Sequence, residues 1–231
     1  MLKHQVKNRE TALPLFDIYI NQGWDAFIGH PETSTEIESV LVLAVANKKS
    51  DFALKILETT PPLSDGGRSA FATCCKTQQW DVAQALVNQI PKNNPFVQRY
   101  MALEALKCKN IDLMEHVVNH SETKSEVVYV LLQECAKKIS NPYAFEKLLA
   151  YLSTPVHQQD LCELFLWECP DYAKIMLQTI AGLFDQMASH DLAPQGRQNF
   201  EILYAEHQKE VLASTVLSAD PERNDTRAKK I

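Results

Sequence analysis

Residues 67–87 read GRSAFATCCKTQQWDVAQALV, and this stretch decides the fold because a similar stretch precedes it. Residues 39–57 read SVLVLAVANKKSDFALKIL and align with it without a gap at an offset of 30 residues. Each copy holds two apolar segments joined by a tight polar connection. In the later copy, small and apolar residues at helical spacing predict helices over 70–77 and 80–87. Ser69 is the expected N-cap of the first helix, after a turn glycine at position 67.

The second apolar segment recurs along most of the chain. It opens at Asp51, Asp81, Asp112 and Asp171, which gives steps of 30, 31 and 59 residues. The last step spans two units, with a less regular copy starting at Pro142 between them. A period of about 30 residues is typical of stacked repeats, in which each unit buries its apolar face only against its neighbours. The four aspartates fall in the first turn of successive helices, where negative charge favours the helix dipole. We therefore interpret them as structural.

These units resemble the ankyrin repeat, whose pattern runs Gly-x-Thr-Pro-Leu-His-x-Ala-Ala-x-x-Gly-His and continues into an apolar helix ending in Leu-Leu. In residues 67–87, the matches are Gly67, Ser69 for threonine, Phe71 for leucine, Cys74-Cys75 for the paired alanines, and Leu86-Val87 for the terminal leucines. The resemblance covers about residues 36–180. It implies an all-α fold: an α-solenoid of about five helix-turn-helix repeats with capping helices at both ends.

The sequence also departs from the ankyrin pattern. The Thr-Pro-Leu-His tetrapeptide is absent, and the Gly-His pair is replaced by Lys48-Lys49 or Gln78-Gln79. The period is 30–31 residues, against about 33 in the family. The spacing therefore supports the resemblance more strongly than residue identity does.

The repeat register divides the chain into four parts. They are an N-terminal cap (1–35), the repeat stack (36–180), C-terminal capping helices (181–218) and a charged, disordered tail (219–231). The fourth repeat carries an extra residue near 139–142, and the fifth places Leu164-Phe165 at the paired-alanine position. Within the C-terminal cap, residues 195–217 predict a long amphipathic helix. One side of it gathers Phe200, Leu203, Tyr204, Val211 and Leu212.

Composition narrows the function classes. Of 231 residues, 45% are hydrophobic, and 6 glycines against 11 prolines disfavour a turn-rich β fold. The net charge of −6 argues against general nucleic-acid binding. No apolar run approaches the roughly 18–20 residues that a membrane span requires. The first ten residues, MLKHQVKNRE, lack the apolar segment of a secretory signal peptide.

The cysteines and histidines form no familiar metal motif. The six cysteines, none in a CxxC pair, are Cys74, Cys75, Cys108, Cys135, Cys162 and Cys169. Most fall where a repeat requires small apolar residues, so we interpret them as reduced thiols in a reducing compartment such as the cytoplasm. His116 and His120 are four residues apart and could share a metal on one helix face. Histidines near a helix C-terminus are more often surface residues that interact with the dipole.

Signals for catalysis are weak. The chain has no Gly-rich phosphate loop, no Gly-x-Ser-x-Gly elbow and no His-Glu-x-x-His helix. A cysteine nucleophile would need a base beside it, and the sequence does not place His116, His157 or His190 next to one. We therefore predict no catalytic residues, no metal and no cofactor.

A binding surface is predicted from the repeat register. In ankyrin-like units, the two residues after the paired alanines face the concave side, and lysine takes the first of these positions in three successive units. Such lysines are either ordinary solvated residues or a basic ridge for an acidic partner. Trp24 and Trp80 are expected to pack, whereas Trp167 is either an exposed anchor or covered by the C-terminal cap. The predicted partner-binding residues are Asn47, Lys76, Thr77, Lys107, Lys137, Lys138 and Trp167.

Three functions remain after these observations. The leading one is a non-enzymatic module that binds another protein as an adaptor, an inhibitor or, by analogy with other degenerate ankyrin-like proteins, an effector delivered into a host cell. The alternative is an enzyme or enzyme subunit with a site between the solenoid and residues 181–217. The third is a structural oligomer of capped stacks.

Overall fold

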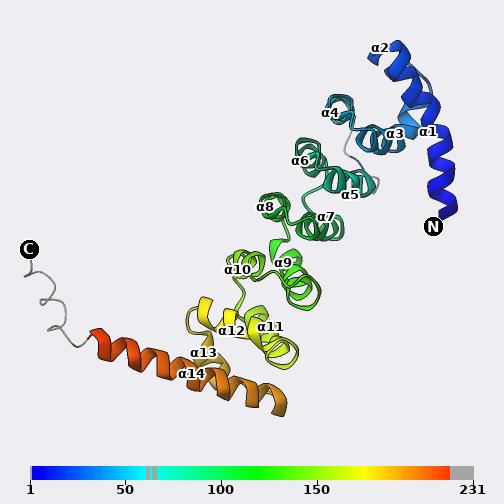
Figure 1. Ribbon diagram of the computed structural model, residues 1–231. Coiled ribbons are helices and arrows are strands. Elements are labelled where there is room, and N and C mark those ends of the chain that lie inside the picture. Colours follow the sequence, from blue (N-terminus) through cyan, green and yellow to red (C-terminus); the bar gives the residue numbers. More distant parts are fainter. Residues whose placement is uncertain (1, 61–62, 64–66, 219–231) are drawn as a thin grey trace, which may run out of the picture. The chain divides into compact units, whose positions relative to one another are not determined.

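The structure, a computed structural model, describes residues 2–60, 63 and 67–218, and the side chains of residues 12–60, 63 and 67–215. Every regular element in these residues is a helix (Figure 1), which confirms the all-α prediction. The tail predicted to be disordered, residues 219–231, lies outside the described residues. The chain divides into two compact units, Met1–Cys135 and Ala136–Ile231, here called unit 1 and unit 2.

Unit 1 is built from helices that contact their neighbours along the chain. In order, they are α1 (Leu2–Gln22), α2 (Trp24–Ile28), α3 (Thr33–Ala46), α4 (Ser50–Thr59), α5 (Gly67–Thr77), α6 (Trp80–Asn88), α7 (Pro95–Lys107), α8 (Ile111–His120) and α9 (Lys124–Glu134). α3 packs on α4, α5 on α6 and α7 on α8. The first helices of these pairs also contact one another in succession, α3–α5–α7–α9, and so do the second helices, α4–α6–α8. α1 packs on α3 and α2.

Unit 2 continues with helix pairs and ends in a long helix. Its elements are α10 (Pro142–Leu149), α11 (Pro155–Glu168), α12 (Pro170–Thr179), α13 (Leu183–Ala188) and α14 (Pro194–Ser218). α12 packs on both α10 and α11, while α13 and α14 pack on α11. Before α10, the chain passes through a π-helical turn, η1 (Cys135–Ile139). This wide turn takes up the extra residue predicted near 139–142.

The first helices α3, α5 and α7 end in the same backbone turn. Lys48, Gln78 and Lys109 adopt positive φ angles of 57°, 60° and 59°. The next amide in each case donates to a carbonyl five residues earlier; the bonds are Lys49 to Ala44 (2.9 Å), Gln79 to Cys74 (3.0 Å) and Asn110 to Ala105 (3.0 Å). This is the Schellman pattern of a helix C-terminus, which usually places glycine at the left-handed position. The tight connection predicted at Gln78-Gln79 is therefore confirmed.

The cores of unit 1 and unit 2 include the apolar pairs that the repeat pattern identifies. Ala44-Val45, Cys74-Cys75, Ala105-Leu106 and Cys135-Ala136 are all buried. So are the terminal pairs Ile56-Leu57, Leu86-Val87, Val117-Val118, Leu148-Leu149 and Met176-Leu177. The repeated aspartates lie in the first turns of α4, α6, α8 and α12, as predicted. Burying one side chain as large as leucine contributes about 1.5–3 kcal/mol to the stability of the folded chain.

Two local predictions around the repeats are wrong. α5 begins at Gly67, so Ser69 lies within its first turn and is not the N-cap. Gly67 is buried, and a Cβ there would lie 3.6 Å from Leu63 Cδ1 and 3.8 Å from Leu86 Cδ2. Such distances are ordinary van der Waals contacts, so Gly67 is a buried residue of α5 and not a turn glycine before it. In α11, Leu164 is half-buried while Phe165 and Leu166 are buried, which shifts the paired position by one residue.

The predicted apolar side of α14 is only partly covered. Phe200 is buried and Tyr204 half-buried, and both rings lie near Phe184 of α13, with centroids 6.3 and 6.0 Å away. Val211 and Leu212, however, are 43% and 63% exposed. These two residues lie beyond the turns of α14 that carry Phe200 and Tyr204, the residues whose rings contact α13.

Candidate functional site

The predicted binding residues of unit 1 lie at the C-terminal ends of the first helices. Lys76 and Lys107 each follow two buried residues and are exposed. Asn47 caps α3, and its Nδ2 donates to the Leu43 carbonyl at 2.8 Å. Thr77 is also used internally, because its hydroxyl donates to the Thr73 carbonyl at 2.8 Å. The lysines are therefore the residues of this set whose charged groups face solvent.

The charge of these lysines is partly balanced. Lys107 Nζ lies 2.8 Å from Glu104 Oε1, one turn earlier on α7. The hydrogen bond to this carboxylate raises the pKa of Lys107, so the ammonium form is favoured. Lys76 forms no ion pair with any described residue. A basic surface in unit 1 is therefore centred on Lys76, with Lys107 tied to Glu104.

In unit 2, two of the predicted residues, Lys137 and Trp167, lie near the end of α11. Lys137 forms an ion pair with Glu168, which directly follows Trp167. Lys138 is exposed. Trp167 is 65% exposed, so the indole is not covered by the C-terminal helices. Of the two alternatives for this tryptophan, the exposed one is correct.

An aromatic and cationic cluster on α5 and α7 was missed by the sequence reasoning. The Arg68 guanidinium lies 5.1 Å from the ring centroid of Phe96 and 5.7 Å from that of Tyr100. Phe96 is 61% exposed although it is a large apolar residue. Burial and the nearby Glu104 carboxylate raise the pKa of Tyr100, which keeps its hydroxyl protonated. We call Arg68, Phe96 and Tyr100 the α5–α7 cluster.

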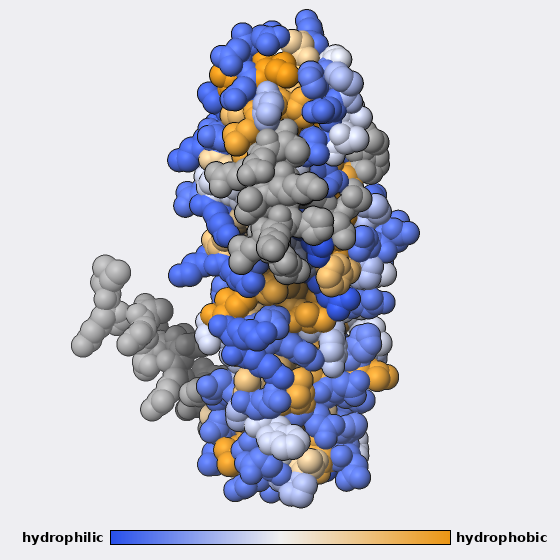
Figure 2. Space-filling view, turned by 90° about the vertical axis from the view of Figure 1, so that its right-hand side faces the viewer, coloured by the Kyte–Doolittle hydropathy of each residue, from blue (hydrophilic) through white to orange (hydrophobic). Residues whose placement is uncertain are grey.

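A signal for this cluster was present in the sequence. Phe96, Tyr100 and Glu104 are spaced four residues apart, which places them on one face of a helix. Lys107 follows three residues later on the same face, and Lys76 lies on α5 with Arg68. The face of the molecule in Figure 2 is mainly hydrophilic, with hydrophobic residues in small separate areas. Single exposed apolar residues are common on protein surfaces, so what distinguishes this cluster is the arginine beside the rings of Phe96 and Tyr100.

A groove in unit 1 lies between the end of α1, α2 and the start of α4. It has a volume of about 640 Å³ and is lined by Tyr19, Ile20, Trp24, Lys48, Lys49 and Lys55 among others. Its aromatic wall is well packed: the Tyr19 and Phe52 rings are stacked with centroids 3.4 Å apart. Lys55 Nζ lies 4.7 Å from the Trp24 ring centroid. We call this space the α1–α4 groove.

A smaller groove occupies the equivalent position one repeat later. It is lined by Ser50, Gln78, Gln79, Trp80, Asp81 and Val82, and its volume is about 240 Å³. Gln78 and Gln79 take the places of Lys48 and Lys49, and Trp80 takes the place of Ser50. The two grooves therefore differ in charge and in the residue that follows the paired lysines or glutamines, which is Ser50 in one and Trp80 in the other.

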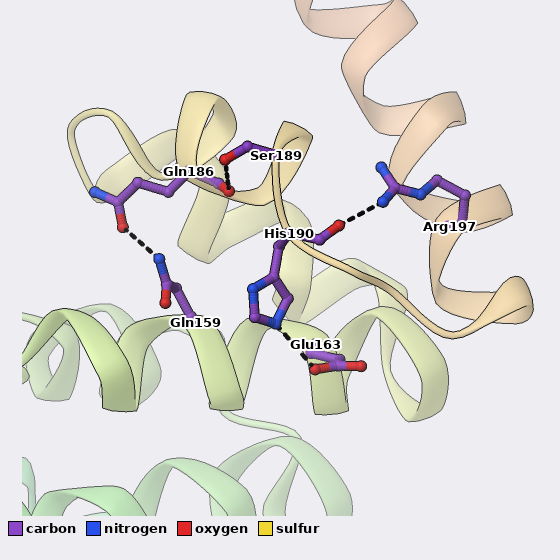
Figure 3. Close-up of polar contacts among 6 residues, drawn as sticks. All are labelled: Gln159, Glu163, Gln186, Ser189, His190 and Arg197. Atoms are coloured by element: carbon purple, nitrogen blue, oxygen red, sulfur yellow. Dashed lines mark hydrogen bonds and ion pairs between the residues drawn. The ribbon is translucent and has the colours of Figure 1, made fainter.

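Unit 2 contains a polar cluster where α13 and its following loop meet α11 (Figure 3). His190 Nε2 lies 3.3 Å from Glu163 Oε2, and Gln159 Nε2 donates to Gln186 Oε1 at 3.3 Å. Arg197 of α14 donates to the backbone carbonyl of His190. Because these groups connect α11, α13 and α14, the cluster holds the last helices of the chain together. Neither groove of unit 1 is lined by any of these residues.

The thiols are placed for packing. Burial raises the pKa of Cys74, Cys75, Cys135 and Cys162 to about 12, so all four remain protonated at neutral pH. Protonated thiols are weak nucleophiles and weak metal ligands. His120 already uses Nε2 in a 2.9 Å contact with the Ile90 carbonyl. Within the described part of the chain, no three His, Cys, Asp or Glu side chains gather as metal ligands.

Comparison of the chain with protein-family models, with curated proteins and with solved structures finds no match. Among the described residues, no helix combines the length and the apolar character needed to cross a bilayer.

Proposed function

We propose that this chain is a non-enzymatic protein-interaction module, built as an ankyrin-like α-solenoid of about five helix pairs. The single observation that carries the proposal is the α5–α7 cluster, in which the half-buried Arg68 and Tyr100 lie beside the exposed Phe96 on two neighbouring first helices. Arginine and aromatic residues are enriched among the residues that dominate binding energy at protein interfaces. Lys76 and Lys107 extend the same two helices toward their C-terminal ends.

The repeated helix ends support an ankyrin-like architecture. The left-handed residues Lys48, Gln78, Lys109 and Ser140 follow one another at intervals of 30, 31 and 31 residues. They stand where the ankyrin pattern has its second glycine. A hydrogen bond also joins neighbouring helix pairs of unit 1: Gln89 Nε2, just after α6, donates to the Leu57 carbonyl of α4 at 2.8 Å. Contacts of this kind, between one repeat and the next, are the interactions on which stacked repeats depend.

The chemistry of the surface favours an acidic partner. The chain as a whole carries −6, so an acidic protein would be repelled from most of its surface. Lys76 on α5 is a local exception, while Lys107 on α7 is paired with Glu104. In unit 2, Lys137 is paired with Glu168, the residue after Trp167. Charges of this type steer association and fix register more than they add affinity. The aromatic rings of Phe96 and Trp167 would supply the apolar contacts.

The alternative is an enzyme with a site near residues 181–217. One contact favours it, the His190–Glu163 pair, because a carboxylate beside a histidine is a common element of acid–base sites. The raised pKa of the buried thiols disfavours cysteine chemistry. The free cysteines instead support action in a reducing compartment, which we propose to be the cytoplasm, including that of a host cell if the chain is an effector.

The proposal is tested by affinity capture with the full chain and two matched variants. Arg68→Ala/Phe96→Ala removes the cation and the exposed ring of the α5–α7 cluster. Tyr143→Ala/Lys147→Ala is the control, because this pair in unit 2 is also an exposed ring with a cation 5.8 Å from its centroid. We expect the wild type and the control to retain a stoichiometric partner that the first variant loses. Equal capture by all three would contradict the proposed surface.

A further inference from the structure

The α1–α4 groove is larger than the equivalent groove one repeat later, and one difference between them is the residue that follows the paired lysines or glutamines. In the equivalent groove one repeat later, Trp80 lines the space and the volume is about 240 Å³. In the α1–α4 groove, that position is Ser50, and the volume is about 640 Å³. Ser50 Oγ donates to Gln79 Oε1 at 2.9 Å, so the serine is turned toward the next repeat. The two grooves thus differ at this position, which holds serine in one and tryptophan in the other.

The rim of the groove is cationic. Lys48, Lys49 and Lys55 are exposed, and none of them forms an ion pair with a described residue. Asp51 is the one carboxylate among the residues that line the groove. The next repeat has glutamines in place of Lys48 and Lys49, so this charge belongs to the α1–α4 groove and not to the repeat pattern. Unpaired cations around an open space are complementary to a ligand with carboxylates.

The wall of the groove is aromatic. Tyr19 and Trp24 are half-buried and Ile20 is 47% exposed, so part of each remains accessible. Tyr19 is held by stacking on Phe52, and Trp24 lies 5.5 Å from Phe27 and 6.1 Å from Phe52, between ring centroids. Rings that are fixed by packing lose little entropy when a ligand binds against them. A further aromatic side chain could pack here in an edge-to-face or offset arrangement.

We propose that the α1–α4 groove binds an acidic peptide segment of a partner protein, with an aromatic side chain of that segment in the space beside Ser50. The aromatic side chain occupies the place that Trp80 takes in the next repeat. Carboxylates on either side of it meet Lys48, Lys49 and Lys55. The inference rests on the proposed function, since it names the class of partner segment that such a module would bind.

A peptide fits better than an anionic membrane or a phosphate group. The net charge of −6 opposes approach to an extended anionic surface. Asp51 lines the groove and would repel a dense phosphate, whereas it can accept hydrogen bonds from the backbone amides of a peptide. The groove is also hollow with an aromatic wall, which a flat lipid surface would not fill.

The test is a selection from a phage-displayed library of random peptides on the full chain. Two variants copy the chain's own next repeat: Ser50→Trp introduces the larger side chain of that repeat, and Lys48→Gln/Lys49→Gln removes two charges. The matched control is Lys109→Gln/Lys124→Gln, because these exposed lysines also lack ion pairs with described residues and Lys109 shares the left-handed conformation of Lys48. Thermal unfolding monitored by circular dichroism establishes that each variant is folded.

We expect selected peptides to be enriched in Asp and Glu beside an aromatic residue. Each groove variant should weaken the binding of these peptides roughly tenfold or more, which is the effect of losing close charge pairs or a buried aromatic contact at an interface. The control should bind the peptides as the wild type does. Recovery of no such peptides, or peptide binding by Ser50→Trp and by the lysine variant that equals binding by the wild type, would overturn the proposal. If Ser50→Trp does not fold, the lysine variant alone decides. Binding of phosphatidylserine vesicles that needs Lys48 and Lys49, without acidic peptides, would also overturn it.

This result is separable from that of the proposed function. Arg68→Ala/Phe96→Ala alters the α5–α7 cluster and leaves every residue that lines the α1–α4 groove in place. Peptide binding that survives in this variant supports the groove whether or not the variant still captures a partner protein. Partner capture that depends on the cluster, with no peptide bound in the groove, would support the proposed function and reject the inference.

Discussion

Gln79 donates a hydrogen bond from Nε2 to the carbonyl oxygen of Val45 at 2.7 Å, across 34 residues of chain. The same side chain accepts from Ser50 Oγ at 2.9 Å. Val45 lies near the end of α3, where the last carbonyls have no partner within the helix. One glutamine at the start of α6 thus satisfies backbone and side-chain groups of the preceding helix pair.

Replacing this glutamine should loosen the contact between the two helix pairs. We expect Gln79→Ala to lower the free energy of unfolding by about 1–2 kcal/mol, because the Val45 carbonyl loses its side-chain donor. Gln84→Ala is the control, since Gln84 is exposed on α6 and should change stability by less than about 0.5 kcal/mol. Urea unfolding followed by circular dichroism measures both. Equal midpoints for the two variants would contradict the assigned role.

The left-handed helix ends should be improved by glycine. Lys109 has a φ of 59°, a conformation that costs a residue with a Cβ about 1 kcal/mol. We expect Lys109→Gly to raise the unfolding free energy by up to about 1 kcal/mol, although the greater freedom of glycine in the unfolded chain offsets part of it. Lys76→Gly, in the last turn of α5, should instead lower it. A loss of stability in both variants would argue against strain at Lys109.

The exposed Trp167 and the buried Phe165 should respond differently to truncation. We expect Trp167→Ala to change stability by less than about 0.5 kcal/mol, because the side chain is 65% exposed. Phe165→Ala should cost about 3–5 kcal/mol, since it leaves a cavity between α11 and its neighbours. Both are measured by chemical unfolding. A large loss on removing Trp167 would mean that the indole is covered in solution.

The buried thiols predict how stability depends on alkaline pH. Burial raises the pKa of Cys162 from 9.0 to about 12, so the folded state keeps its proton while the unfolded chain loses it above about pH 9. The stabilisation is fully present below that pH and falls as the pH rises toward 12. We expect the urea midpoint to decline less steeply above pH 9 in Cys162→Ala than in the wild type. Parallel declines would show that this thiol does not contribute.

The amino-acid pattern predicts the buried side of this protein well, because burial repeats with the helix pairs. The paired residues such as Cys74-Cys75 and the first-turn aspartates were placed correctly from spacing alone. The wrong predictions concern places where the chain departs from its own repeat pattern. Ser69 looks like an N-cap, yet α5 begins two residues earlier, at Gly67. In α11, a one-residue shift places Phe165-Leu166 at the paired position.

The candidate sites depend on relationships that a single repeat does not contain. Arg68 and Phe96 lie on different helices, so their contact depends on how α5 packs against α7. The space beside Ser50 is visible only when that residue is compared with Trp80 in the folded chain. The repeat pattern does not decide whether Trp167 is exposed, because that depends on where α14 lies. Such features come from tertiary packing, which a periodic pattern does not specify.

The π-helical turn at Cys135–Ile139 has a consequence for how this chain can change in length. An additional residue inside a regular helix would rotate every later side chain by about 100° about the helix axis. Buried positions would then face water, and the downstream helices would lose their packing partners. Because the wide turn takes up the surplus residue locally, an insertion at this point leaves the hydrophobic faces of α10 and α11 where they were. Evolution can therefore lengthen one repeat without redesigning the next.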